Sequence, residues 1–576
     1  MQNTKKKLFS ITNLKKYFPI AKSSVFQKEK LYVKANEDVS IDIYEGETFG
    51  LVGESGCGKS TLGRVILQLY EQTSGNTLYY GRSREEIAPE YVKKTLSAPE
   101  KYLNLYKDAK AKADKITAQV EAEGEKASFF LLQEKNLADA NAKAALMNVT
   151  KILGGLITVS EMKEGATILL NQHNVLVKID KLNRKLTDID ASIDIYESKI
   201  KLDSAESDEK TIKSESATLN AFRAKKEKII ETIKALRIEE DRLQKEIDAI
   251  RAKYKDDEEF QKYEAMLDAG IDLARLKYRE IRRLRKDLQI VFQDPYSSLD
   301  PRMTIGQIIE EGLVTHKYFK HGSPKMKEYI LKVMRDCGLQ DYMLHRYPHQ
   351  FSGGQRQRVC IARALAVKPK FVVCDECVSA LDVSIQSQII NLLLELKEKE
   401  HLTYLFISHD LSVVRYISDR IGVMYLGNLV ELASSETIFK DPRHPYTVAL
   451  LSSIPTTDPD DLNKERIILE GNIPSPIRPP EGCKFHTRCF MACDKCKRVP
   501  PPLVEIEPGH FVACHLYDKE VMDNLAKYDE EYAELERKRL EEEAEKNRLA
   551  ELKKGKLPFG KKTAKAADEK SEENRE

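Results

Sequence analysis

One segment, GESGCGKST at residues 53–61, constrains the fold of this chain more than any other. It matches G-x-x-x-x-G-K-[ST] between a predicted strand at residues 48–52 and a predicted helix at residues 61–70. The glycines let backbone N–H groups wrap a phosphate chain, and the helix N-terminus adds positive potential. Lys59 is suited to reach the β- and γ-phosphates of a nucleotide, and the Ser60 hydroxyl to bind Mg²⁺. Because strand, loop and helix are all in place, a chance glycine-rich turn is a poor alternative.

A second motif places two carboxylates directly after an apolar run, FVVCDE at residues 371–376. Sheets of this type bind ligands at the C-terminal ends of their strands. Asp375 is therefore suited to hold Mg²⁺ through water, and Glu376 to polarise an attacking water. An Asp-Glu pair by itself would indicate a solvated turn. Behind four apolar residues and downstream of a phosphate loop, it indicates nucleotide hydrolysis.

The middle of the chain has a different character, with no proline between Pro99 and Pro295. Its Lys, Glu, Ala, Ile and Leu content is typical of long helices, which we expect to break near Gly124, Gly154 and Gly165. Two apolar stripes of heptad spacing flank a polar turn, which predicts an antiparallel coiled-coil hairpin. The stripes are Leu176, Ile179, Leu182, Leu186, Ile189, Ile193, Tyr196 and Ile200, then Leu219, Phe222, Ile229, Ile233, Leu236, Leu243, Ile247, Ile250 and Tyr254. Such an insertion either docks a partner or elaborates a loop without function.

Composition excludes some classes of protein. The 576 residues are 32% charged with a formal net charge of +2, which argues neither for nor against nucleic acid. No run of eighteen apolar residues occurs, so no membrane span is predicted. Five of the ten cysteines lie between Cys483 and Cys514, a clustering that suggests a metal site before it suggests disulfides.

The order of the motifs, phosphate loop, VFQDP, FSGGQRQR, VVCDE, SALD and ISHD, resembles that of ABC ATPases. The resemblance implies an α/β P-loop NTPase fold with a RecA-like core, an antiparallel β subdomain and a helical subdomain. It also implies ATP and Mg²⁺ as ligands. The implied catalytic residues are Lys59, Gln293, Glu376 and the switch histidine His409, and the implied Mg²⁺ ligands are Ser60, Gln293 and Asp375. The other implied nucleotide contacts are Phe18 (or its neighbour Tyr17) on adenine, Gly53, Glu54, Ser55, Gly56, Cys57, Gly58, Lys59, Ser60 and Thr61, the signature residues Ser352, Gly353, Gly354 and Gln355, and the D-loop residue Asp382.

Finer matches resemble the second ATPase subunit of oligopeptide and dipeptide importers. They include QIVFQDPYSSLDPRMTIGQII, YPHQFSGGQRQRVCIARALA and HPYTVALLSSIP, and Gln355 favours the second subunit over its usual partner. One departure is Cys377, where the family usually has proline; because Glu376 is intact, we expect hydrolysis to survive. Cys57 lies at a helix N-terminus, where we expect its thiol to be reactive.

The C-terminal cysteines follow the spacing of the same importer family. Cys483, Cys489, Cys496 and Cys514 would hold a [4Fe–4S] cluster by this resemblance, with Cys493 as an extra thiol. Zinc is the second choice, because the spacing lacks the paired C-x₂-C knuckles of zinc ribbons. Free thiols in a small packed appendix are the alternative.

The resemblance implies partners as well as ligands. These are a second ABC ATPase subunit (a heterodimer), two transmembrane permeases and, indirectly, a peptide-binding protein, at the cytoplasmic face of the cell membrane and without nucleic acid. One alternative is a DNA-maintenance ABC ATPase, whose coiled coil separates the glutamine loop from the signature. Here Gln293 and Ser352 are only 59 positions apart, and the predicted coil precedes both. A further alternative is a coiled-coil interaction protein with a regulatory ATPase.

These observations divide the chain into five segments. We predict an N-terminal ATPase part at 1–82, a helical insertion at 83–286, the remainder of the ATPase at 287–440, a peptide-importer extension at 441–518 containing the cysteines, and a charged helix with a disordered tail at 519–576.

Overall fold

The structure, a computed structural model, forms two compact units, Met1–Cys514 and His515–Glu576. It describes residues 5–21, 30–124, 127–203, 209–454 and 467–518, so the predicted tail helix lies outside the described residues. The described part of the second unit is a short 3₁₀ turn, His515–Tyr517, in which the His515 ring faces Asp518 at 2.9 Å. Everything below concerns the first unit.

The core of the first unit is an eight-stranded sheet in the order β11-β12-β10-β9-β3-β8-β7-β6. The strands β9, β3, β8, β7 and β6 are parallel, with β6 at one edge, and β10, β12 and β11 continue the sheet on the other side in antiparallel pairing. The strands are β3 Thr48–Val52, β6 Leu288–Val291, β7 Phe371–Asp375, β8 Thr403–Ile407, β9 Arg420–Tyr425, β10 Asn428–Ser434, β11 Val504–Glu507 and β12 His510–Val512.

The parallel strands are apolar because both faces of the sheet are covered. Every residue of β3, β7 and β8 is buried. Along β7, Phe371 and Val373 enter one hydrophobic core, whereas Val372 and Cys374 enter the other. A strand covered on both sides has no polar face, so it reads as a continuous apolar run.

A second, antiparallel sheet has the strand order β2-β1-β4-β5. Its strands are β1 Lys7–Pro19, β2 Tyr32–Tyr44, β4 Ser74–Tyr79 and β5 Ile271–Asp272. In β5, Ile271 pairs with Tyr79 although almost two hundred positions separate them, so the chain returns to the same edge after a long excursion. Ile271 and Leu284 share a core with Leu8, which means that residues on the C-terminal side of the excursion pack as part of the ATPase-like body.

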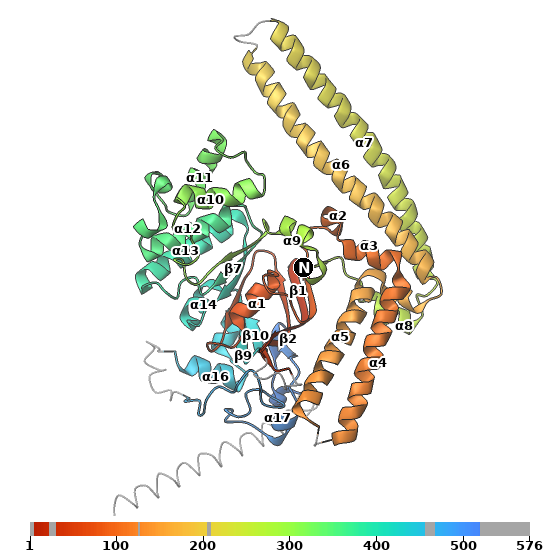
Figure 1. Cartoon of the computed structure of the whole chain (residues 1–576), viewed down its shortest axis with the longest axis vertical. Helices are drawn as coiled ribbons and strands as arrows, with labels where there is room; N and C mark the ends of the chain where they lie inside the picture. Colours follow the sequence, from red (N-terminus) through yellow and green to blue (C-terminus); the bar gives the residue numbers. More distant parts are fainter. Residues whose placement is uncertain (1–4, 22–29, 125–126, 204–208, 455–466, 519–576) are drawn as a thin grey trace, which may run out of the picture. The chain divides into compact units, whose positions relative to one another are not determined.

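The excursion is helical. Its helices are α2 Arg84–Ile87, α3 Glu90–Ser97, α4 Pro99–Glu123, α5 Phe129–Leu153, α6 Met162–Asp203, α7 Glu209–Ala252 and α8 Glu258–Glu264. Helices α6 and α7 lie side by side (Figure 1), and Ile189, Ile193, Leu219 and Ile229 are buried between them. The heptad stripes therefore face each other; a supercoil stays a prediction.

The predicted breaks near Gly124 and Gly154 coincide with the ends of α4 and α5, and the interruption after α5 ends at Met162, three residues before Gly165. Gly165 lies inside α6, where a Cβ would come within 3.0 Å of Leu156. A glycine here allows close packing of helix α6 on the turn at Gly154–Thr158 rather than ending the helix.

The remaining helices surround the large sheet. They are α1 Lys59–Ile66, α9 Tyr278–Leu284, α10 Ile305–Thr315, α11 Pro324–Asp336, α12 Gly353–Ala366, α13 Val383–Glu400, α14 Leu411–Ile417, α15 Ser435–Lys440, α16 Pro445–Ser452 and α17 Asp494–Arg498. Among the described residues, none of the helices combines the length and the apolar character that crossing a bilayer requires.

Candidate active site

Four neighbouring strands of the large sheet end in the predicted site residues. In the order β3, β8, β7 and β6, these strands lead to the phosphate loop, His409, Glu376 and Gln293. Ile407, the last residue of β8, is in register with Leu51 of β3 and with Asp375 of β7. Parallel strands in this register place their C-terminal ends at one edge, where ligands of such sheets bind.

Glu376 lies at the centre of this edge. Gln293 Nε2 donates a hydrogen bond of 2.7 Å to Glu376 Oε2, and His409 Nδ1 lies 3.6 Å from Glu376 Oε1. The backbone of Glu376 is left-handed, with φ of +49°, and its N–H donates to the carbonyl of Ile407 at 2.9 Å. A strained backbone at a polar site is a feature of functional positions. The structure thus brings together three of the four predicted catalytic side chains.

The fourth, Lys59, lies at the start of α1 and is 4% exposed. Its Nζ donates to the carbonyl oxygens of Gly53 at 2.7 Å and Glu54 at 3.0 Å, so the ammonium is held within the phosphate loop. At Gly58, φ is +99° and a Cβ would lie 2.1 Å from the carbonyl oxygen of Ala35. Only glycine fits there, and the loop follows the path that a phosphate cradle requires.

Asp375 is the buried carboxylate of the site, with 1% of its surface exposed. Its Oδ2 accepts a hydrogen bond of 3.1 Å from Arg64 Nη2, an ion pair that sequence reasoning missed. Its Oδ1 is buried and has no hydrogen-bond partner among the described residues. A buried carboxylate oxygen without a donor fits a hydrated divalent cation, for which oxygen ligands are preferred. Ser60, half-buried at the start of α1, is the second predicted ligand.

The signature segment opens helix α12. The Ser352 hydroxyl accepts from the Gln355 N–H, and the Gln355 side chain accepts from the Ser352 N–H, which forms a capping box. Gly354 packs on α13, because a Cβ there would lie 2.5 Å from the Ile385 side chain. Asp382 caps α13 through a bond of 2.9 Å from the Ile385 N–H. The starts of α12 and α13 are therefore fixed against each other.

The two aromatic candidates of β1 differ in burial. Tyr17 is 3% exposed and donates a hydrogen bond to Glu37 at 2.5 Å, so its hydroxyl is already bound inside the protein. Phe18 is half-buried, and its ring meets Tyr70 edge-on at 5.5 Å. The Lys16 Nζ lies 4.6 Å from the centroid of the Phe18 ring, and Phe18 is the more exposed of the two candidates.

Comparisons with known proteins decide the family. The ABC transporter family model matches residues 36–152 and 263–379, and the model of the oligopeptide/dipeptide transporter C-terminal region matches residues 430–496. The chain is 52% identical over 256 residues to the oligopeptide transport ATP-binding protein AppF of Bacillus subtilis, covering 44% of this chain and 77% of that protein.

Two further relatives agree with this result. The chain is 49% identical over 247 residues to the oligopeptide transport ATP-binding protein OppF of Haemophilus influenzae, covering 42% of this chain and 74% of the relative. It is 54% identical over 245 residues to a putative peptide import ATP-binding protein of Brucella ovis, covering 42% and 76%. This chain belongs to the ATP-binding subunits of ABC transporters. It is an ATPase.

The structure of this ABC ATPase corrects the prediction that the Cys57 thiol is reactive. Cys57 is 5% exposed, and burial raises the pKa of its thiol, an effect that outweighs the nearby Lys59 ammonium. A buried thiol that stays protonated is a poor nucleophile. The expected reactivity of Cys57 is therefore not what the structure indicates.

The C-terminal cysteines do not form a ready metal site. Within the described ranges, no group of three or more His, Cys, Asp or Glu side chains is arranged to hold a metal ion. The Sγ atoms of Cys493 and Cys496 are 3.3 Å apart. This pair includes the extra thiol Cys493, and the predicted [4Fe–4S] set is not supported, nor is zinc.

Sequence reasoning also missed the residues that bind the phosphate loop from outside. Tyr446 and Arg488 both contact Glu54, and Asn36 Nδ2 donates to the Gly58 carbonyl at 3.1 Å. No local pattern marks these residues.

Proposed function

We propose that this ABC ATPase energises the import of oligopeptides, working with a second ATPase subunit on two membrane permeases. The observation that carries the hydrolytic part is the convergence of Gln293 and His409 on Glu376, next to the phosphate loop. The peptide substrate is supported by the C-terminal family match at residues 430–496 and by the oligopeptide transport for which the relatives are named.

The chemistry assigned to the edge is attack of water on the γ-phosphorus of ATP. The oxygen of water forms the new P–O bond, the bond from the γ-phosphorus to the bridging oxygen breaks, and ADP leaves with the electron pair. Glu376 orients the water and accepts its proton, while His409 contacts the γ-phosphate and Gln293 positions the carboxylate. Lys59 exchanges its carbonyl partners for phosphate oxygens. Ser60, Gln293 and Asp375 would hold Mg²⁺, which would supply positive charge to balance the phosphate oxygens.

The signature is assigned to the nucleotide of the neighbouring subunit. Helix α12 begins at Gly353 with its first N–H groups available beyond the Ser352 cap, which suits it to an anion. Closure of two subunits would bring Ser352–Gln355 of one onto the γ-phosphate held by the other and exclude water from both. Asp382, in the D-loop, would contact the neighbouring subunit, so that the nucleotide bound at one site affects the other site. We place this assembly peripherally at the cytoplasmic face of the membrane.

Three further assignments stay proposals. Phe18 is assigned to adenine because it is the more exposed of the two aromatic candidates. The cluster ligands Cys483, Cys489, Cys496 and Cys514 rest on family spacing alone, and iron content with visible absorbance of anaerobically purified protein tests them. The five segments keep their predicted boundaries, except that residues 271–284 are assigned to the ATPase because they share its core.

Reconstitution tests the proposal. The chain, its second ATPase subunit and both permeases are placed in proteoliposomes, and ATP-dependent uptake of a radiolabelled tetrapeptide is measured with the cognate binding protein outside. Uptake is expected with the native chain and with Lys225→Ala, an exposed control on α7, and is expected to disappear with Lys59→Ala. ATP hydrolysis without peptide uptake would reject the substrate class. Tight DNA binding with a steep salt dependence would favour a DNA-maintenance role instead.

A further inference from the structure

Glu54, the second residue of the phosphate loop, is held by the C-terminal extension. Arg488 Nη1 donates to Glu54 Oε2 at 2.8 Å and Arg488 Nη2 donates to Glu54 Oε1 at 3.1 Å, which is a bidentate pair. The Glu54 N–H donates to the Tyr446 hydroxyl at 2.9 Å. Tyr446 and Arg488, both more than 390 positions downstream, thus hydrogen-bond to the backbone and the side chain of Glu54, respectively.

The extension presents Arg488 rigidly. The Arg488 N–H donates to the carbonyl of Phe485 at 3.0 Å, and the Arg488 side chain is only 7% exposed. Phe485 is 1% exposed, and its ring meets Tyr425 at 5.2 Å and Tyr446 at 5.3 Å. An aromatic cluster at the end of β9 therefore anchors the turn that carries the guanidinium. Bidentate pairs of this kind fix geometry as well as charge.

This contact lies on the loop that must accept the triphosphate. The Glu54 carbonyl also accepts from Lys59 Nζ at 3.0 Å, so one residue links the phosphate-binding lysine to the extension. The negative charge of the Glu54 carboxylate would repel the nucleotide phosphates if nothing balanced it. In a partly desolvated site such repulsion is stronger than in water. Arg488 supplies the balancing charge.

We propose that Arg488 is a positioning residue for ATP binding, through which the C-terminal extension sets the conformation and the charge of the phosphate loop. The proposal rests on the ATPase activity of the chain and not on the peptide substrate. It gives the extension a role at the nucleotide in addition to any role of its cysteines. Tyr446 fixes the backbone of Glu54, and Arg488 fixes and neutralises its carboxylate.

A double-mutant cycle on the isolated full chain tests this role. The Kd for MgATP is measured by titration calorimetry, together with KM and kcat, for Arg488→Ala, Glu54→Gln and the double variant. Arg488→Ala is expected to raise Kd and KM roughly tenfold with a smaller change in kcat. In the Glu54→Gln background, where no carboxylate remains to be balanced, the same substitution is expected to change Kd by less than about twofold.

Three control variants separate this role from a general loss of positive charge or of packing. Arg498→Ala removes an exposed arginine of the same extension and is expected to leave Kd unchanged. Arg488→Lys keeps the charge without the planar fork and is expected to restore part of the affinity, whereas Arg488→Gln, which keeps polarity alone, is not. An unchanged Kd in Arg488→Ala, or an equal loss of affinity with and without the Glu54 carboxylate, would overturn the proposal. Because no permease or peptide is present, failure here is distinct from failure of the transport assignment.

Discussion

Gly58→Ala is the substitution whose effect the structure specifies best. The new Cβ would lie 2.1 Å from the carbonyl oxygen of Ala35, whereas non-bonded heavy atoms settle near 3.5 Å. The phosphate loop or β2 must therefore shift by about 1 Å, and a misplacement of that size near the reacting groups lowers rates roughly 10²-fold. The φ of +99° adds a backbone cost of about 1–2 kcal/mol for a residue with a side chain.

The assay compares kcat/KM for ATP hydrolysis and the unfolding midpoint of the variant with those of Gly56→Ala. Gly56 has a φ of +81° with open space around its Cβ position, so its alanine variant carries the backbone cost without the collision. Gly58→Ala is expected to lose about 100-fold in kcat/KM and to be the less stable of the two variants. If Gly58→Ala hydrolysed ATP within threefold of the native rate, the packing of the phosphate loop on Ala35 would not be what positions it.

Three other predictions concern different parts of the molecule. Gln293→Ala frees the Glu376 carboxylate and removes one proposed Mg²⁺ ligand, so steady-state ATPase assays should show kcat lowered roughly 10–100-fold together with weaker MgATP binding; unchanged kcat would refute the positioning role. Burial lowers the pKa of His444 from 6.5 to about 4, against the opposing effect of Glu431, so the unfolded state takes up the proton first as pH falls. The free energy of unfolding should therefore drop between pH about 6.5 and 4 by up to about 3 kcal/mol, and denaturant titrations of His444→Gln should show a flatter profile. Replacing residues 182–233 by a short Gly-Ser turn should leave ATPase activity unchanged, because the apolar side chains there pack against each other; lost activity would assign the hairpin a part in hydrolysis.

The sequence could indicate which side chains lie near each other because these residues follow strand ends. Each of Lys59, Glu376 and His409 follows an apolar run within a few residues, and parallel strands bring their C-terminal ends to one edge without further information. The order of the motifs was therefore enough to predict which side chains meet. Burial could not be predicted in the same way. The helix N-terminus would lower the pKa of the Cys57 thiol, whereas burial raises it. Which effect is larger depends on packing that the motif does not specify.

Contacts between residues far apart in the sequence could not be predicted either, because they also depend on tertiary packing. Arg488 meets Glu54 across 434 positions, and the pairing depends on how the extension lies on β9 through Tyr425 and Phe485. Likewise, a glycine in a helical pattern predicts a break, yet Gly165 serves close packing inside α6. Local pattern specifies what an element is, and tertiary packing decides what its neighbours are.

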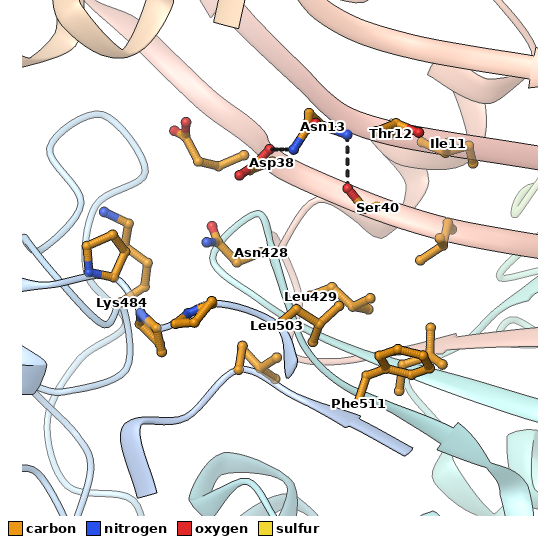
Figure 2. Close-up of a pocket in the computed structure, with 18 of the residues that line it drawn as sticks. Ile11, Thr12, Asn13, Asp38, Ser40, Asn428, Leu429, Lys484, Leu503 and Phe511 are labelled. Carbon is orange, nitrogen blue, oxygen red and sulfur yellow. Dashed lines mark hydrogen bonds between the residues drawn. The ribbon is translucent and has the colours of Figure 1, made fainter. Parts of the chain in front are cut away.

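A pocket beside the antiparallel sheet is lined by residues that lie far apart in the sequence, so no local pattern could predict it (Figure 2). Its cavity of about 810 Å³ is lined by Asn13 and Asp38 of the first two strands, by Leu429 of β10 and by Lys484 and Phe511 of the extension. Asn13 Nδ2 donates to Asp38 Oδ1 at 2.6 Å, so these two polar groups already satisfy each other. Segments far apart in the sequence, including Asn136 of α5, make this cavity, and no one of them predicts it alone.

The most direct test of the account is the Glu376→Gln variant of the purified chain, assayed for MgATP binding and for single-turnover hydrolysis. The substitution keeps the hydrogen-bonding shape beside Gln293 and His409 but removes the group that accepts the proton of water. MgATP binding should stay within about twofold of the native value, and hydrolysis should fall at least roughly 10²-fold. Hydrolysis at a near-native rate would contradict the assignment of Glu376 as the catalytic base.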